Sequence, residues 1–178
     1  MAETNCNRSQ SPNEVVRVVI VESYDLNAEF WRLALASPRF GIKVLRATSD
    51  PQRALDAIAR MRPEVALVAA RIGEDPLGGF GLALQIDALG TITQTVLLLD
   101  TDDEGLIVDA FRHGAAGTIS RTQCLDAIRT NPGQNASAEF IAAVLRSVGH
   151  GELTFVANGI LHHRRDPRNL HARERVGR

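Results

Sequence analysis

The chain has 178 residues, of which 44% are hydrophobic and 23% charged, and its formal net charge is -1. These are ordinary values for a soluble globular protein, and they argue for neither a polyanion partner nor a strongly acidic surface. Cys6 and Cys124 lie far apart, without the spacing of a zinc site or a disulfide framework. Since no apolar run reaches membrane-span length and residues 1–14 lack a signal-peptide core, we expect a cytoplasmic protein without membrane contact.

The charge is distributed unevenly along the chain. Residues 162–178 contain six arginines against two acids, so the remainder of the chain is acidic. Every basic residue except Lys43 is an arginine. The polar residues 1–14 predict a disordered leader.

Strand and helix patterns then alternate five times with short connections. Strands are expected at 15–21, 42–45, 65–70, 95–99 and 117–119, with helices at about 25–35, 51–61, 82–89 and 104–113 between them. Near-continuous β-branched runs predict strands that are buried on both faces. The alternation predicts an α/β fold, a doubly wound five-stranded parallel sheet with helices on both faces and its functional crevice at the carboxyl ends of the strands.

Local signals refine these elements. Asp25 and Asp50 are the expected helix caps, and Pro51 suits a first helical turn. The apolar set around Phe30, Trp31 and Leu33 has helical spacing, and we expect Trp31, the only tryptophan, to be part of the core.

Beyond Arg121 the pattern loosens before a last helix, which Ser137 is expected to cap. Its apolar stripe consists of Phe140, Ile141, Val144, Leu145 and Val148. We therefore expect one domain over residues 15–152. Residues 153–178 are then a basic tail, or a linker to an effector domain that this chain lacks.

Five segments carry a resemblance to a known family. They are Arg17-Val-Val-Ile-Val-Glu22, Arg62-Pro-Glu-Val-Ala-Leu-Val68, Thr95-Val-Leu-Leu-Leu-Asp100, Ala110-Phe-Arg-His-Gly-Ala-Ala-Gly117 and Val144-Leu-Arg-Ser-Val-Gly-His-Gly-Glu152. Their order resembles the receiver domain of response regulators, of the kind that precedes LuxR-type helix-turn-helix domains. The resemblance covers about residues 15–152 and implies a flavodoxin-like fold, with an insertion at 124–136 before the last helix.

The same resemblance implies a changed reactive edge. A receiver binds magnesium through an acid pair after the first strand and an aspartate that ends the third strand and accepts the phosphoryl group. A hydroxyl residue ending the fourth strand and a lysine ending the fifth bind the phosphoryl oxygens. Here these positions fall on Glu22 and Ser23, on Ala69 (Ala70 if the register slips by one), on Asp100 and on Arg121. The resemblance thus argues for the fold and against phosphotransfer.

Three readings of this edge are open. Glu74 or Asp75 in the following loop would be a weak substitute for the missing aspartate. Glu22 and Asp100 are weak candidates for a magnesium ion. The favoured interpretation is an ion pair between Asp100 and Arg121, since a guanidinium fits a carboxylate well and competes with a cation for it.

The leading functional hypothesis is a pseudo-receiver signalling module, not an enzyme, that works by protein contact as a homodimer. The stripe on the last helix is a candidate interface. The alternative is a DNA-binding regulator, because Leu170-His-Ala-Arg-Glu-Arg175 resembles the opening of a LuxR-type helix-turn-helix. Nucleic-acid binding would then need an effector domain beyond Arg178. The candidate phosphate contacts in the tail are Arg164, Arg165, Arg168, Arg173 and Arg175. No nucleotide fingerprint or catalytic triad supports a third reading, an enzyme or small-ligand binder.

Overall fold

Strands and helices alternate from β1 to β5, as the sequence predicts. The computed structural model describes residues 15–124, 136–157 and 160–165. The elements in chain order are β1 (Val16–Val21), α1 (Asp25–Ala34), the short 3-10 helix η1 (Pro38–Phe40), β2 (Ile42–Thr48), α2 (Pro51–Met61), β3 (Val65–Ala69), α3 (Gly78–Ala88), β4 (Gln94–Leu99), α4 (Glu104–Arg112), β5 (Ala115–Ser120), α6 (Ala136–Gly149), β6 (Glu152–Ala157) and β7 (Ile160–Arg165).

The sheet has the strand order β2-β1-β3-β4-β5-β6-β7. The first five strands are parallel, which confirms the predicted doubly wound sheet. The sheet then continues past residue 152, where the sequence suggested the end of the domain. β6 pairs with β5 in parallel, and β7 returns antiparallel along β6.

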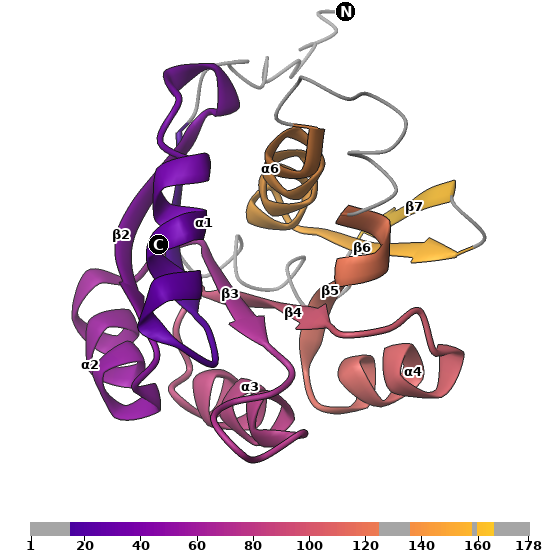
Figure 1. Cartoon of the computed structure of the whole chain (residues 1–178), viewed down its shortest axis with the longest axis horizontal. Helices are drawn as coiled ribbons and strands as arrows, with labels where there is room; N and C mark the ends of the chain where they lie inside the picture. The colour runs from indigo at the N-terminus through magenta and orange to yellow at the C-terminus, as the bar shows by residue number, and fades with distance from the viewer. Residues whose placement is uncertain (1–14, 125–135, 158–159, 166–178) are drawn as a thin grey trace, which may run out of the picture.

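Helices cover both faces of this sheet (Figure 1). Along β1 the side chains alternate between two cores, because successive residues of a strand point to opposite faces. Val18 and Ile20 pack in the core beneath α1 and α6, whereas Val19 and Val21 pack in the core beneath α2 and α3. Both faces of the central strands are therefore buried, which explains the continuous apolar runs in the sequence.

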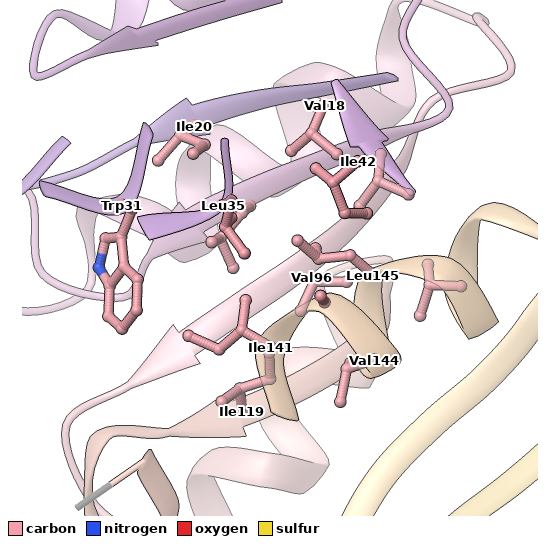
Figure 2. Packing of buried hydrophobic residues seen from close by; sticks show 14 of the residues in the cluster. Val18, Ile20, Trp31, Leu35, Ile42, Val96, Ile119, Ile141, Val144 and Leu145 are labelled. Atoms are coloured by element: carbon pink, nitrogen blue, oxygen red, sulfur yellow. The ribbon is translucent and has the colours of Figure 1, made fainter. Parts of the chain in front are cut away.

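α6 uses its apolar stripe to cover the sheet (Figure 2). Ile141, Val144, Leu145 and Val148 are completely buried in the first core. Burial of each such side chain contributes about 1.5–3 kcal/mol. The stripe is therefore part of the core and is not available as the dimer interface that the sequence suggested.

The two predicted aspartate caps behave differently. Asp50 precedes α2 and its carboxylate accepts hydrogen bonds from the backbone N–H groups of Gln52 and Arg53, as expected for a cap. The prediction for Asp25 is wrong. The cap position of α1 is Tyr24, and Asp25 lies inside the helix, where its carboxylate accepts a bond from the backbone N–H of Ser49 at 2.9 Å.

α1 carries two apolar stripes on opposite sides. Ala28, Trp31 and Leu35 face the core. Phe30 and Leu33 point away from the core, since each is 60% exposed, so the apolar set of the sequence is divided between two sides of the helix. Both stripes have helical spacing, so periodicity alone could not tell which one faces the sheet.

In the described part of the chain, no helix has the length and apolar character needed to span a membrane.

Candidate functional site

The sheet register brings the predicted site residues together at one edge. Val21 pairs with Val68, Ala69 with Leu98, and Leu99 with Ser120. The residues at and just beyond these strand ends therefore form a row, namely Glu22, Ala69, Asp100 and Arg121. The carboxyl edge of a parallel sheet is where such folds place their functional groups.

Glu22 is the buried charge of this row, with only 1% of its surface exposed. Its Oε1 accepts a hydrogen bond from Nε1 of Trp31 at 2.9 Å. Its Oε2 accepts one from Nη2 of Arg121, also at 2.9 Å. A buried carboxylate is costly unless it is paired and hydrogen-bonded, and these two side chains meet both requirements.

Arg121 joins two carboxylates. Its Nη2 lies on Glu22, and its Nε donates to Oδ1 of Asp100 at 3.1 Å. The predicted ion pair between Asp100 and Arg121 is therefore confirmed. Burial of the guanidinium opposes its charge, but the two carboxylates outweigh that effect and raise the pKa of Arg121 above the ordinary arginine value. The side chain stays positively charged.

A second arginine, which the sequence did not single out, completes the network. Nε of Arg71 lies 3.6 Å from Oδ2 of Asp100, so this carboxylate sits between two guanidinium groups. The backbone carbonyl of Arg71 accepts a hydrogen bond from Oγ of Ser23 at 2.6 Å. The loops after β1, β3 and β4 and the start of the segment after β5 are thus tied together.

Ala69 ends β3 in a closed position. It is 1% exposed, and Ala70 is 6% exposed. The chain returns over both residues at the start of α3, where the backbone N–H of Gly79 donates to the carbonyl of Ala70 at 2.9 Å. A Cβ at position 79 would lie 2.0 Å from the carbonyl oxygen of Ala69, so only glycine allows this approach.

The chain after β5 is fixed by side chains that sequence reasoning also missed. Oγ of Ser120 donates to a carboxylate oxygen of Asp102, and it accepts the backbone N–H of Gln123 at 3.1 Å. The backbone N–H of Ser120 in turn donates to Oε1 of Gln123. Residues 121–124 are helical, so these reciprocal bonds resemble a helix cap and set the direction in which Arg121 leaves the sheet.

The residues at this edge do not fit a magnesium ion. Both oxygens of Glu22 already accept N–H donors, and Asp100 is flanked by two guanidinium groups. A divalent cation would have to displace or approach these positive charges. Ser23, in the second acid position, has its hydroxyl on a backbone carbonyl. Among the described residues, no cluster of three or more His, Cys, Asp or Glu could hold a metal.

The alternative carboxylates lie in the loop between β3 and α3. Glu74 and Asp75 are exposed, and Oδ1 of Asp75 accepts the N–H of Leu77 at 2.9 Å. Ala69 and Ala70 have methyl side chains, which offer no atom that can accept a phosphoryl group.

The predicted basic contacts and insertion fall largely outside the described part. Arg164 and Arg165 belong to β7, but their side chains are not described. Arg168, Arg173 and Arg175 lie outside the described residues, as do residues 125–135 of the predicted insertion.

Solved structures that resemble this chain come from response regulators. The chain is similar to the signal receiver domain of the response regulator NarL from Mycobacterium tuberculosis, with 25% identity, a TM-score of 0.58 and coverage of 76% of this chain and 97% of that one. It also resembles the response regulator domain of CheB from Thermotoga maritima (17% identity, TM-score 0.59, 76% and 97% covered). A DNA-binding response regulator of the LuxR family from Staphylococcus aureus is a third neighbour (12% identity, TM-score 0.58, 75% and 98% covered).

No protein-family model and no curated protein matches the sequence. The likeness therefore rests on three-dimensional structure: the chain has the fold of a response-regulator receiver domain.

Proposed function

We propose that this receiver-type domain is a pseudo-receiver, a signalling module that acts through protein contact, as a homodimer in the cytoplasm, without aspartyl phosphorylation. The proposal rests on two features that occur together: an alanine occupies the phosphoacceptor position, and the guanidinium of Arg121 lies within the site. Ala69 offers no nucleophile, and Arg121 lies between Glu22 and Asp100 with hydrogen bonds to both. The guanidinium thus supplies internally the positive charge that a bound magnesium ion would otherwise bring.

The network also supports a single fixed state of this edge. In a switching receiver, the loops after the third and fourth strands respond to the phosphoryl group. Here Asp100 holds Arg71 from one loop and Arg121 from the segment after β5. Since the charges are already matched, an added anion would gain little and would face the carboxylates of Glu22 and Asp100.

Incubation with acetyl phosphate, followed by intact-mass analysis, tests the proposal. The wild-type chain is expected to gain no hydroxylamine-labile phosphoryl adduct. A variant that restores the receiver pattern, Ser23→Asp with Ala69→Asp, Asp100→Thr and Arg121→Lys, is the positive control and is expected to gain one. A labile adduct on the wild-type protein would refute the proposal.

An exposed apolar surface on α1 supports the proposed homodimer. Leu26, Phe30 and Leu33 are 80%, 60% and 60% exposed and follow one another at spacings of four and three residues, the spacing of packed helices. The stripe is bordered by an internally neutralised pair, Glu29 and Arg32. Two copies of the chain can therefore bring this stripe together without like-charge repulsion, and we assign it to the homodimer.

A DNA-binding regulator is the second candidate. One structural neighbour is a DNA-binding response regulator of the LuxR family, and residues 170–175 resemble the opening of such a domain. This function requires a helix-turn-helix after Arg178, because a recognition helix must enter the major groove. The reading frame of the gene beyond Arg178 decides between the two: a helix-turn-helix there favours regulation of transcription.

A further inference from the structure

Three arginines and one aspartate line a surface pocket of about 210 Å³ at the edge of the fold opposite β7. Arg53, Asp56 and Arg60 follow one another on α2 at spacings of three and four, which places them on one side of the helix. Arg46 comes from β2, the edge strand beside α2 (Figure 1). The four side chains thus reach the pocket from two elements.

The guanidinium groups of this pocket are incompletely neutralised. In the part of the chain that the structure describes, neither Arg46 nor Arg60 has a carboxylate within 4.0 Å. Nε of Arg60 donates to the backbone carbonyl of Asp56 at 3.2 Å, which orients the guanidinium and leaves its Nη groups available. Arg53 has only a loose contact with Asp50 at 3.4 Å. The lining has one carboxylate against three guanidinium groups, and Asp50 adds a second carboxylate at Arg53, so one positive charge remains in excess.

Asp56, the carboxylate of the lining, is already included in this count. Oδ1 of Asp56 accepts a hydrogen bond from the side-chain amide of Gln52 at 3.2 Å, one turn earlier in α2. The carboxylate of Asp56 therefore has a neutral partner. The neighbouring Arg60 donates to the backbone carbonyl of Asp56 and not to its carboxylate.

A second pocket of the molecule provides a contrast, because its arginines have internal partners. Its lining residues are Arg39, Phe40, Glu139 and Arg146. Arg39 pairs with Glu139 at 3.0 Å, and Nη1 of Arg146 donates to the carbonyl of Phe40 at 2.6 Å. Arg60, like Arg146, donates to a backbone carbonyl, so the two pockets differ chiefly in Arg46, which has no carboxylate within 4.0 Å among the described residues.

We infer that the pocket between β2 and α2 is a binding site for the phosphate group of a small phosphorylated ligand. Guanidinium groups bind phosphate through two parallel N–H bonds, and donors from two elements suit an anion with several oxygens. The volume fits one or two phosphate groups and is below that of the usual pocket for a drug-sized molecule.

A titration of the whole chain with inorganic pyrophosphate tests this site. Calorimetry measures the affinity, and NMR chemical-shift changes locate the bound anion. The double variant Arg46→Ala with Arg60→Ala is expected to bind about tenfold more weakly or worse, since it loses charged hydrogen bonds from both elements. Arg112→Ala removes another exposed arginine, from α4, where Asp109 pairs with it, and this variant is expected to bind as the wild type does. Arg46→Lys with Arg60→Lys keeps the charge and is expected to recover part of the affinity.

A gain-of-affinity variant makes the test independent of any damage to the fold. Asp56→Asn removes the one negative charge of the lining, and its amide oxygen can still accept the bond from Gln52, so pyrophosphate is expected to bind more tightly. Acetate, a carboxylate probe, is expected to bind at least tenfold more weakly than pyrophosphate. The inference is overturned if the shifts fall outside residues 46–60, if the double variant matches Arg112→Ala, or if acetate binds as well as pyrophosphate.

Discussion

Nη2 of Arg121 lies 2.9 Å from Oε2 of Glu22, although 98 residues of chain separate the two. The arginine is one third exposed, whereas the glutamate is buried. The contact therefore neutralises a carboxylate that the fold has already removed from water. Loss of either partner therefore has a different consequence. Without the arginine, the carboxylate of Glu22 would stay in a place that water reaches poorly.

Replacement of Arg121 by alanine is expected to lower the free energy of unfolding by about 1–3 kcal/mol, since Glu22 then keeps only Trp31 and the N–H of Ser23 as partners. Arg121→Lys should lose less, because an ammonium group retains the charge. Urea denaturation measures both values. Arg112→Ala breaks an exposed pair within one helix turn and should cost about 0.5 kcal/mol or less. An Arg121→Ala protein as stable as this control would contradict the structural role of the pair.

Acid stability depends in part on Glu64. Burial of its carboxyl opposes ionisation, but hydrogen bonds from the side chain and backbone N–H of Arg17 outweigh burial and hold the pKa of Glu64 below its ordinary value of 4.5. A carboxyl with a lowered folded-state pKa contributes stability above pH 4.5, and this contribution is lost as the pH falls through the folded-state value. Glu64→Gln is therefore expected to flatten the acid side of the stability curve, measured by urea unfolding at a series of pH values. An unchanged slope would count against the assignment.

Two glycines of α3 form a matched pair. A methyl group at Gly79 would meet the carbonyl oxygen of Ala69, whereas no atom lies within 4 Å of a Cβ at Gly81. Gly79→Ala is expected to destabilise the chain by at least about 2 kcal/mol, because backbone must shift. Gly81→Ala should stabilise it by about 0.5–1 kcal/mol through helix propensity. Thermal and urea unfolding compare the two, and equal effects of the two substitutions would show that α3 does not close over β3 as described.

The thiol of Cys124 is expected to be nearly inert in the folded protein. Burial raises its pKa to about 11, above the ordinary value of 9.0, so its thiolate fraction near pH 8 falls by about a hundredfold. In a Cys6→Ser background, iodoacetamide should label Cys124 at least about a hundredfold more slowly than it does in urea. Equal rates in the folded and unfolded protein would contradict this burial.

The sequence could predict the order of elements because each carries a local signal. The β-branched runs marked the central strands, and Asp50 followed by Pro51 marked the start of α2. The site row was also predictable, since strand ends meet at one edge once the register is known. The ion pair of Asp100 and Arg121 was predictable from the receiver resemblance, which places both positions at this edge, and from their opposite charges.

The remaining features depend on tertiary contacts that local patterns do not contain. Asp25 looks like a cap, but its partner is Ser49, on a different strand end. The roles of Trp31 as a donor to Glu22 and of Arg71 as a partner of Asp100 require the folded loops. One missed feature did have a local signal: Asn158-Gly159 is a hairpin dipeptide, and it lies between β6 and β7.

The prediction that the chain self-associates through α1 tests the proposed homodimer most directly. If Leu26, Phe30 and Leu33 form the interface, sedimentation of the wild type at high micromolar concentration should show a monomer–dimer equilibrium. Phe30→Glu places a charge at the centre of the stripe and should give a monomer. The single chain should lose about 0.5–1.5 kcal/mol of stability, because the ring is mostly exposed but packs edge-to-face on Trp31. Val108→Glu adds the same charge to an exposed apolar position of α4 and should leave the equilibrium unchanged. A monomeric wild type, or a dimer that both substitutions weaken equally, would refute the assignment of this stripe to a second copy of the chain.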